Sequence, residues 1–247
     1  MNYFDCNAQI GRYGVKHPEA FTTADELLKE MEYSGISEAL VVHAMAKEYH
    51  PAVGNEMLLD EIEGKPLHPC WTVMPHHTGE IPKPDDLLVS MKQKGVKALR
   101  AYPVMHQFRL SDWCAGELLD MVEANGIPLL LDSDQTSYED VAGILRDHPK
   151  LNLALMRVYY RANRYLYPLF EKYENLCIEA ATYQVNYGIE EVCKRFGVKR
   201  LLFGTGLPVT EVGPSIAQIA YAEISDEEKQ MIASGNLRRM LAWGDAR

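Results

Sequence analysis

A single (β/α)8 barrel of the TIM type, formed by residues 1–247 as one domain, is the fold that the sequence predicts. Short apolar runs recur along the chain, and turn residues and an amphipathic stretch follow each run, which is the pattern of repeated βα units. Eight runs are present, and the intervals of about 24 to 37 residues between them suit one strand, one helix and two loops. The runs are centred near Phe4, Val41, Thr72, Ala98, Leu130, Ala154, Ile178 and Leu202.

The composition of these runs indicates buried parallel strands. Residues 39–42 and 127–131 are almost continuously apolar, as expected for strands that are buried on both faces. The alternative fold is an open doubly wound sheet, which usually carries a glycine-rich phosphate-binding turn after its first strand. Residues 6–14 contain no G-x-G-x-x-G pattern, so the barrel is favoured.

Helix boundaries are marked by residues with known capping roles. Hydroxyl side chains able to cap free backbone amides precede helix-like stretches at Thr22 or Thr23, Ser111 and Ser225. Glycines stand where helices should end before the next strand, at Gly35, Gly95, Gly126 and Gly197. The last stretch, after Ser225, predicts a C-terminal helix that packs on the outside of the barrel through Met231, Leu237, Met240 and Leu241.

Composition and charge exclude several classes of protein. Hydrophobic residues make up 47% of the chain, enough for a sizeable core, and the formal net charge is −10 with a pI near 5.3. An acidic chain without a clustered basic stripe is not typical of a protein that binds nucleic acid or an anionic membrane. The first residues lack a signal-peptide pattern, and no apolar run approaches the roughly 20 residues of a membrane span, so we expect a cytoplasmic protein.

The cysteines predict neither a disulfide framework nor a structural zinc site. Their number is odd, they are widely spaced, and no C-x-x-C pattern occurs among Cys6, Cys70, Cys114, Cys177 and Cys193. Free cysteine behaves as a small hydrophobic residue, so we expect most of these side chains to be buried.

Several segments, in the correct order along the chain, resemble one enzyme family. In that family an apolar first strand runs through Asp into His-x-His and Gly, and here residues 3–11 keep the strand, Asp5 and Gly11. Residues 95–103 resemble its Gly-x-Lys-Gly-hydrophobic-Arg segment at the fourth strand, and residues 200–208 resemble its Phe-Gly-Ser/Thr-Asp segment at the eighth. Residues 126–132, 147–153 and 232–241 resemble its fifth strand, the approach to its sixth strand and its closing helix. The chain is thus similar to the amidohydrolase-related family of metal-dependent TIM-barrel hydrolases.

The resemblance does not extend to the metal ligands that it implies. The two histidines after the first strand are replaced by Asn7 and Gln9, the fifth-strand histidine by Asp132, and Arg157 falls at or next to the sixth-strand histidine. The eighth-strand Asp, which is both ligand and base in the family, is Gly206. Zinc binds amide oxygens poorly beside N and S ligands, so no metal cofactor is expected. The alternative is a weakly bound hard divalent cation held by Asp5, Asn7, Asp132 and Asp134.

Polar residues follow the predicted strands at the end where barrel enzymes place their active sites. Asp132, His43 and His76 are the candidate catalytic residues, because a carboxylate or an imidazole can transfer a proton near neutral pH. The candidate substrate-binding residues are Arg100, Arg157, Asn7, Gln9, Tyr102, His106 and Glu179. Thr205 is predicted to face the same opening.

The two arginines indicate an anionic ligand. A guanidinium is costly to bury without a counter-charge, and its planar fork suits a carboxylate or a phosphate. Arg100 and Arg157 are therefore expected to hold the carboxylate of a small substrate. The alternative is that they pair with Asp132 and Glu179 across the barrel. His43 has two interpretations as well: a proton-transfer group, or a polar cap on a buried strand.

Three functions remain open from the sequence. The leading hypothesis is a metal-independent hydrolase of a small carboxylated substrate, such as a lactone or an amide, with water activated by Asp132 or a histidine. The second is a lyase or decarboxylase on the same scaffold, which needs acid-base groups and an anion clamp but no nucleophilic water. The third is a non-catalytic binding or assembly barrel. The basic, tyrosine-rich residues 157–165 either steer an anionic substrate inward or form a contact in a homo-oligomer.

Overall fold

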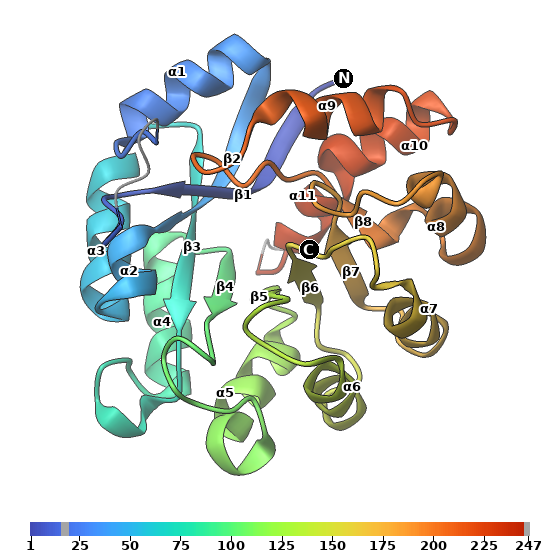
Figure 1. The fold of residues 1–247 in the computed structure, drawn as a ribbon. Helices are drawn as coiled ribbons and strands as arrows, with labels where there is room; N and C mark the ends of the chain where they lie inside the picture. Colours follow the sequence, from blue (N-terminus) through green and yellow to red (C-terminus); the bar gives the residue numbers. More distant parts are fainter. Residues whose placement is uncertain (16–19, 245–247) are drawn as a thin grey trace.

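The computed structural model describes residues 1–15 and 20–244 and confirms the TIM barrel, in which helices surround eight parallel strands (Figure 1). Each strand pairs in parallel with the next one along the chain. The strands are β1 (Tyr3–Ile10), β2 (Ile36–His43), β3 (Leu67–Val73), β4 (Ala98–Ala101), β5 (Leu129–Asp132), β6 (Leu153–Met156), β7 (Leu176–Glu179) and β8 (Leu201–Leu202).

Helices form the returns between the strands. They are α1 (Ala24–Ser34), α2 (Ala44–Glu48), α3 (Pro51–Ile62), α4 (Pro84–Lys94), α5 (Asp112–Asn125), α6 (Tyr138–Asp147), α7 (Asn163–Lys172), α8 (Gly188–Phe196), α9 (Val212–Ala220), α10 (Asp226–Gln230) and α11 (Asn236–Leu241). Short 3-10 turns lie at η1 (His76–Thr78) and η2 (Val198–Arg200), and a π-helical segment, η3, spans Met231–Gly235.

The barrel closes through backbone hydrogen bonds between β1 and the chain around the short strand β8. Cys6 N donates to Phe203 O at 3.0 Å, and Gln9 N donates to Leu207 O at 2.9 Å. In the opposite direction, Gly206 N donates to Asn7 O at 2.9 Å. These bonds satisfy backbone groups that would otherwise form exposed sheet edges. They also place the end of β1 directly beside the loop that follows β8.

Alternate residues of the strands face two different cores. Leu99 and Ala101 of β4 belong to the large apolar cluster between strands and helices, whereas Ala98 belongs to the cluster inside the barrel. The same alternation puts Leu129 and Leu131 outside and Leu130 inside. This period of two is the geometry of a pleated strand. It follows that the next inward position of each strand lies at the barrel mouth.

The C-terminal segment closes the floor of the barrel, and the predicted packing on its outside is wrong. Leu237, Met240 and Leu241 belong to the interior cluster, and Met240 Sδ lies 3.6 Å from Cys177 Sγ. The reason is volume: five inward positions of this cluster are small, namely Cys6, Cys70, Ala98, Ala154 and Cys177, and they leave space for larger side chains. The segment is also not one α-helix, because η3 separates α10 from α11, and Met231 in η3 is only partly buried.

The predicted helix signals are largely confirmed. Thr23 and Ser225 each accept a hydrogen bond from the backbone N–H three residues on and form capping boxes. Gly35, Gly95 and Gly126 end their helices in the left-handed conformation. Two signals differ in detail: Ser111 precedes α5 without a side-chain capping bond, and Gly197 leads into η2. Both still stand at helix boundaries.

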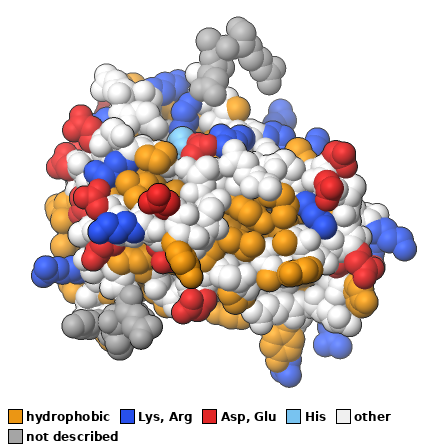
Figure 2. Space-filling model, turned by 90° about the horizontal axis from the view of Figure 1, so that it is seen from above, with side chains coloured by type: hydrophobic (Ala, Val, Ile, Leu, Met, Phe, Trp, Pro, Cys, Tyr) orange, Lys and Arg blue, Asp and Glu red, His pale blue; other side chains and the backbone are white. Residues whose placement is uncertain are grey.

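One side of the molecule has an apolar surface. Helix α9 carries no charged residue, and Tyr221, which follows it, is 86% exposed. Figure 2 looks onto this side from above Figure 1 and shows hydrophobic side chains gathered near its centre, between charged ones on either side. Patches of this kind are typical of contacts between proteins. The homo-oligomer stays a prediction. Within the described ranges, every helix is too short or too polar to cross a bilayer.

We expect Leu237→Ala to destabilise the protein because it opens a cavity in the floor of the barrel. Leu237 is 2% exposed, and truncation of a buried leucine typically costs about 2–5 kcal/mol of the free energy of unfolding. Urea denaturation followed by circular dichroism measures the change. Val89→Ala on α4 is the control, because Val89 is 53% exposed and its truncation should change stability by less than about 0.5 kcal/mol. Equal effects of the two substitutions would contradict the interior position of α11.

Candidate active site

A cavity of about 230 Å³ opens at the carboxyl ends of the strands. Its walls come from several strand ends and the loops that follow them, so residues far apart in the sequence meet there. Among its lining residues are Asn7, Gln9, Tyr13, Lys47, Arg100, Asp132, Arg157, Tyr159, Glu179, Thr182, Thr205 and Thr210. Six of the ten candidate site residues line this cavity: Asn7, Gln9, Arg100, Asp132, Arg157 and Glu179. Thr205 also lines it, as predicted.

Arg100 lies at the centre of a buried polar network. Its Nε donates to Asp132 Oδ1 at 3.0 Å, a second N–H donates to the same oxygen, and Nη1 donates to Asn7 Oδ1 at 2.7 Å. Both Arg100 and Asp132 are almost fully buried. Burial alone would lower the pKa of Arg100, but Asp132 more than offsets this and raises it. Arg100 is therefore a fixed cation, and the predicted alternative of an Arg100–Asp132 pair is confirmed.

Glu179 continues this network on the other side of Asn7. Asn7 Nδ2 donates to Glu179 Oε1 at 2.8 Å, and the backbone N–H of Arg157 donates to Oε2 at 2.9 Å. Burial raises the pKa of Glu179 to about 7, although both hydrogen bonds and the charge of Arg100 act in the opposite direction. Glu179 thus has the affinity for protons that a general acid or base needs near neutral pH.

Gly204 provides the space that Glu179 occupies. A Cβ atom at this position would lie 2.4 Å from Glu179 Oε1 and 2.8 Å from its Cγ, which is closer than real contacts allow. The eighth strand of the resembling family also carries a glycine here, in its Phe-Gly-Ser/Thr-Asp segment. In this chain the glycine has a direct function: it makes room for the carboxyl group of β7.

Asp5 ties β1 to the loop after β8. Its Oδ1 accepts hydrogen bonds from Asn7 N at 2.8 Å and Thr205 N at 3.0 Å, and its Oδ2 accepts from the Thr205 hydroxyl. Burial raises its pKa to about 6 in spite of these bonds. Asp5 does not line the cavity, so its role is to hold the backbone of Asn7 and Thr205 in place.

Arg157 is held in an uncommon backbone conformation. Its φ of 57° lies in the left-handed region, which few non-glycine residues adopt. Its N–H is bound to Glu179, and its carbonyl accepts a hydrogen bond of 2.7 Å from the Ser133 hydroxyl. The backbone is thus fixed from two strands while the half-buried side chain, hydrogen-bonded to Tyr159, lines the cavity. The predicted side-chain pairing of Arg157 with Glu179 is replaced by this backbone contact.

Lys47 is the most informative lining residue that the sequence did not single out. It lies on α2, four residues after His43 at the end of β2, and its carbonyl accepts a hydrogen bond of 2.7 Å from His106 Nε2. Its ammonium lies 5.3 Å from the centre of the Tyr102 ring. Its position in the sequence could have indicated this, because a residue one helical turn beyond a strand end can place its side chain over the barrel mouth.

Four candidate residues do not line the cavity, and each has another place. His43 caps α2, accepting from Met45 N at 3.1 Å, and its other ring nitrogen lies 3.3 Å from Glu61. His76 approaches Glu117 on α5 at 3.8 Å. Tyr102 is buried, with its ring centre 5.6 Å from the Arg100 guanidinium carbon, and His106 contacts Lys47. The geometry favours His43 as a polar cap, and the catalytic roles of His43 and His76 stay predictions.

The residues at the expected metal positions do not fit a divalent cation. The oxygens Asn7 Oδ1 and Asp132 Oδ1 already accept hydrogen bonds from Arg100, whose permanent charge would repel a second cation at the same place. Of the four oxygen ligands considered above, Asp5 does not line this cavity and Asp134 lines a different hollow. Within residues 1–15 and 20–244, no group of three or more His, Cys, Asp and Glu residues is arranged to hold a metal ion.

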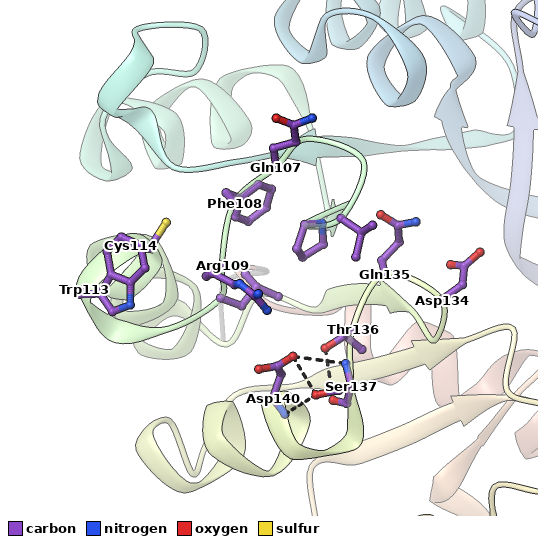
Figure 3. Close-up of a pocket in the computed structure, with 13 residues that line it drawn as sticks. Gln107, Phe108, Arg109, Trp113, Cys114, Asp134, Gln135, Thr136, Ser137 and Asp140 are labelled. Carbon is purple, nitrogen blue, oxygen red and sulfur yellow. Dashed lines mark hydrogen bonds between the residues drawn. The ribbon is translucent and has the colours of Figure 1, made fainter.

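A larger hollow of about 700 Å³ lies between the loops that follow β4 and β5 (Figure 3). It shares no lining residue with the cavity at the strand ends. Its acid Asp140 is engaged with Ser137, which caps α6, as the dashed lines show. Phe108 and the exposed Trp113 give it mainly apolar walls. We place the candidate active site in the smaller cavity because the buried ionisable groups are there.

A known protein family matches the part of the chain that carries much of this cavity. The sequence profile of the amidohydrolase family matches residues 83–243, which is more than half of the chain. The chain belongs to the amidohydrolase family. No curated protein matches the sequence. The residues matched by the family profile include Arg100, Asp132 and Glu179 of the cavity.

Solved structures share the whole barrel at low sequence identity. A 5-carboxyvanillate decarboxylase from Sphingomonas paucimobilis has 12% identity and a TM-score of 0.76, covering 98% of this chain and 99% of its own. A putative 2-pyrone-4,6-dicarboxylic acid hydrolase from Pseudomonas putida has 14% identity and a TM-score of 0.70, covering 99% of both chains. A manganese-bound dihydroxybenzoic acid decarboxylase from a Polaromonas species has 13% identity and a TM-score of 0.68, covering 100% of this chain and 98% of its own. At such identities the likeness shows the fold alone.

We expect Gly204→Ala to destabilise the protein by about 1–3 kcal/mol, because its new methyl group overlaps the Glu179 carboxyl group. Chemical denaturation measures the loss. Gly213→Ala in α9 is the matched control, since a Cβ there meets no atom within 4 Å. The double variant Gly204→Ala/Glu179→Ala should lose less than the sum of the single variants, because Glu179→Ala removes the overlapping group. Additive losses would contradict this account.

The free energy of unfolding should also depend on the ionisation of Glu179. Its pKa is 4.5 in ordinary surroundings and about 7 when buried in the fold, so between these values the folded chain keeps a proton that the unfolded chain has lost. The free energy of unfolding should therefore fall as pH rises from about 4.5 to 7, by up to roughly 3 kcal/mol from this group. Glu179→Gln should show a smaller fall, because only the contribution of Asp5, whose pKa burial raises to about 6, remains. Parallel pH dependences of the wild type and Glu179→Gln would contradict the raised pKa.

Proposed function

We propose that this protein is a metal-independent hydrolase of a small carboxylated substrate, a lactone or an amide, and that Glu179 activates the attacking water. The observation that carries the proposal is the environment of Glu179: a buried carboxyl group with a pKa of about 7 lines a cavity that also contains Arg100 and Arg157. Gly206 leaves no carboxylate at the eighth-strand position of the family's base, so Glu179 takes over proton transfer.

The anion clamp consists of Arg157 together with Arg100. Arg100 uses three N–H contacts on Asp132 and Asn7, and its remaining N–H groups are available to a ligand in the cavity. Gln9 Nε2 is buried and has no hydrogen-bond partner among the described residues. An unpaired buried donor is costly, and a ligand oxygen would satisfy it. These donors suit a carboxylate and the carbonyl oxygen of the bond to be broken.

In the proposed reaction, Asp132 holds Arg100 and does not touch the water. Ionised Glu179 takes a proton from water while the water oxygen attacks the carbonyl carbon. The proton then passes from Glu179 to the leaving alkoxide or amine as the ring or amide opens. Asn7 donates to Glu179 throughout and keeps its carboxylate oriented. The charge that develops on the carbonyl oxygen is stabilised by the nearby cations of the cavity.

A decarboxylase on the same residues is the second candidate. The raised pKa of Glu179 supports this candidate as well. Near pH 7 a large fraction of Glu179 is protonated and can give a proton to the carbon that loses carbon dioxide. Structural neighbours include both decarboxylases and a pyrone hydrolase, and their substrates guide the choice of compounds to test.

We expect 2-pyrone-4,6-dicarboxylate or a similar carboxylated lactone to be opened by the purified protein after dialysis against a chelator. The rate is measured by ultraviolet absorbance, and carbon dioxide release from 5-carboxyvanillate and dihydroxybenzoate is measured in parallel. As Glu179 must be ionised to act as a base, kcat/KM should rise with pH through about 7. Glu179→Gln should lower it by about 10²–10⁴-fold.

The clamp is tested in the same assay. Arg157→Met should weaken the binding of the carboxylated substrate by roughly 1.5–3 kcal/mol, about ten- to a hundredfold, because a charge-assisted contact is lost. Lys92→Met on the exposed side of α4 is the control and should have little effect. Carbon dioxide release without lactone opening would favour the decarboxylase. Inactivity towards all compounds of both classes would favour a binding barrel.

A further inference from the structure

Lys47 has no counter-ion in the part of the chain that the structure describes. No Asp or Glu oxygen there lies within 4 Å of its ammonium, although the side chain lines the cavity beside Asp132 and two arginines. Its contact is the face of the Tyr102 ring, with 5.3 Å from Nζ to the ring centre. A half-buried lysine without a paired carboxylate is unusual in a chain with 35 acidic residues.

The surroundings of Lys47 increase the fraction of its amine that is neutral. Burial lowers its pKa, and the charges of Arg100 and Arg157 act in the same direction, while Asp132 and Asp134 offset part of the effect. A lysine that is desolvated near other cations has a larger fraction of nucleophilic amine at neutral pH. Lysines of this kind form Schiff bases with carbonyl compounds.

The fold holds Lys47 in place from two directions. His43 Nδ1 accepts from Met45 N at the start of α2, so the helix begins at the end of β2. Because a carbonyl can only accept, His106 Nε2 must carry a proton and donate it to Lys47 O. Gly11 makes the cap possible, since a Cβ there would lie 2.7 Å from the His43 ring. The backbone of Lys47 is thus fixed at the cavity wall.

We propose that Lys47 is a nucleophile that condenses with the carbonyl group of a 2-oxo acid to form an imine. The neutral amine attacks the carbonyl carbon, the C–N bond forms, and the C=O π electrons move to oxygen, which takes a proton. Glu179 in its protonated form supplies that proton or the one needed to expel water. Loss of water then gives the protonated imine, so that amine, ketone and one proton become iminium and water.

A 2-oxo acid is the carbonyl compound that the cavity fits best. Its carboxylate lies on the carbon next to the ketone, and the clamp of Arg100 and Arg157 lines the same small cavity as Lys47. An iminium withdraws electrons from its neighbours, which promotes decarboxylation or proton loss beside the former ketone. This activity uses the cavity of the proposed hydrolase but does not depend on its water-activating step.

The test is reductive trapping of the wild-type protein with pyruvate and sodium borohydride. If an imine forms, hydride reduces it to a stable secondary amine, and the mass of one peptide rises by that of pyruvic acid less one oxygen atom. Peptide mass spectrometry should locate this change on Lys47. The reaction with borohydride but without pyruvate should leave the peptide unchanged, and Lys47→Arg should abolish the modification while keeping the positive charge.

The role of the clamp is tested with a second carbonyl compound. Arg157→Met should reduce trapping by pyruvate at least tenfold. Trapping by acetaldehyde, which has no carboxylate, should fall by a clearly smaller factor, because it loses only the effect of the Arg157 charge on the pKa of Lys47. Absence of trapping, or equal modification of exposed lysines such as Lys92, would overturn the proposal. Lactone hydrolysis by a protein that cannot be trapped would leave the hydrolase standing without the imine. Trapping in a protein that is inactive on lactones would support the imine and count against the hydrolase.

Discussion

The buried ion pair between Arg100 and Asp132 is the interaction on which the arrangement of the cavity depends. Two charges inside a barrel are costly to desolvate, and they are stable there only when their hydrogen-bonding groups are paired. Arg100 meets this requirement with Asp132 on one side and Asn7 on the other. Because the Asn7 oxygen faces Arg100, its amide nitrogen must face Glu179. One ion pair thus determines the orientation of residues from β1, β4, β5 and β7.

This network also places a positive charge that belongs to the chain itself at the strand ends of the amidohydrolase barrel. In a metal-dependent relative, a cation at the strand ends would attract the surrounding oxygen atoms. Here the guanidinium of Arg100 supplies a positive charge to Asn7 and Asp132. A covalently attached cation needs no binding equilibrium, but it cannot polarise water as a divalent ion does. In the proposed hydrolase, proton transfer comes from a side chain, and Glu179 is the buried carboxyl group of the lining with a pKa of about 7.

The position of the strand ends explains which site residues could be recognised in the sequence. Arg100 and Asp132 were expected at the mouth because they end predicted strands, and both line the cavity there. Glu179 was expected there for the same reason and Asn7 from the family resemblance, and both line the cavity. The sequence could not say that Glu179 would contact Asn7, because 172 positions separate them and only barrel closure brings β1 and β7 together. It also could not distinguish the cap formed by His43 from a proton-transfer group.

The sequence by itself determined the eight βα units, the helix boundaries near Thr23 and Ser225, and the side chains carried by each strand end. These are local properties, since apolar periodicity and capping involve neighbours within one or two turns. Tertiary structure decided that α11 fills the floor of the barrel, that Lys47 returns over its mouth, and that Glu179 is desolvated beside Gly204. Volume, long-range contact and burial belong to the closed barrel as a whole, because each depends on atoms supplied by distant segments.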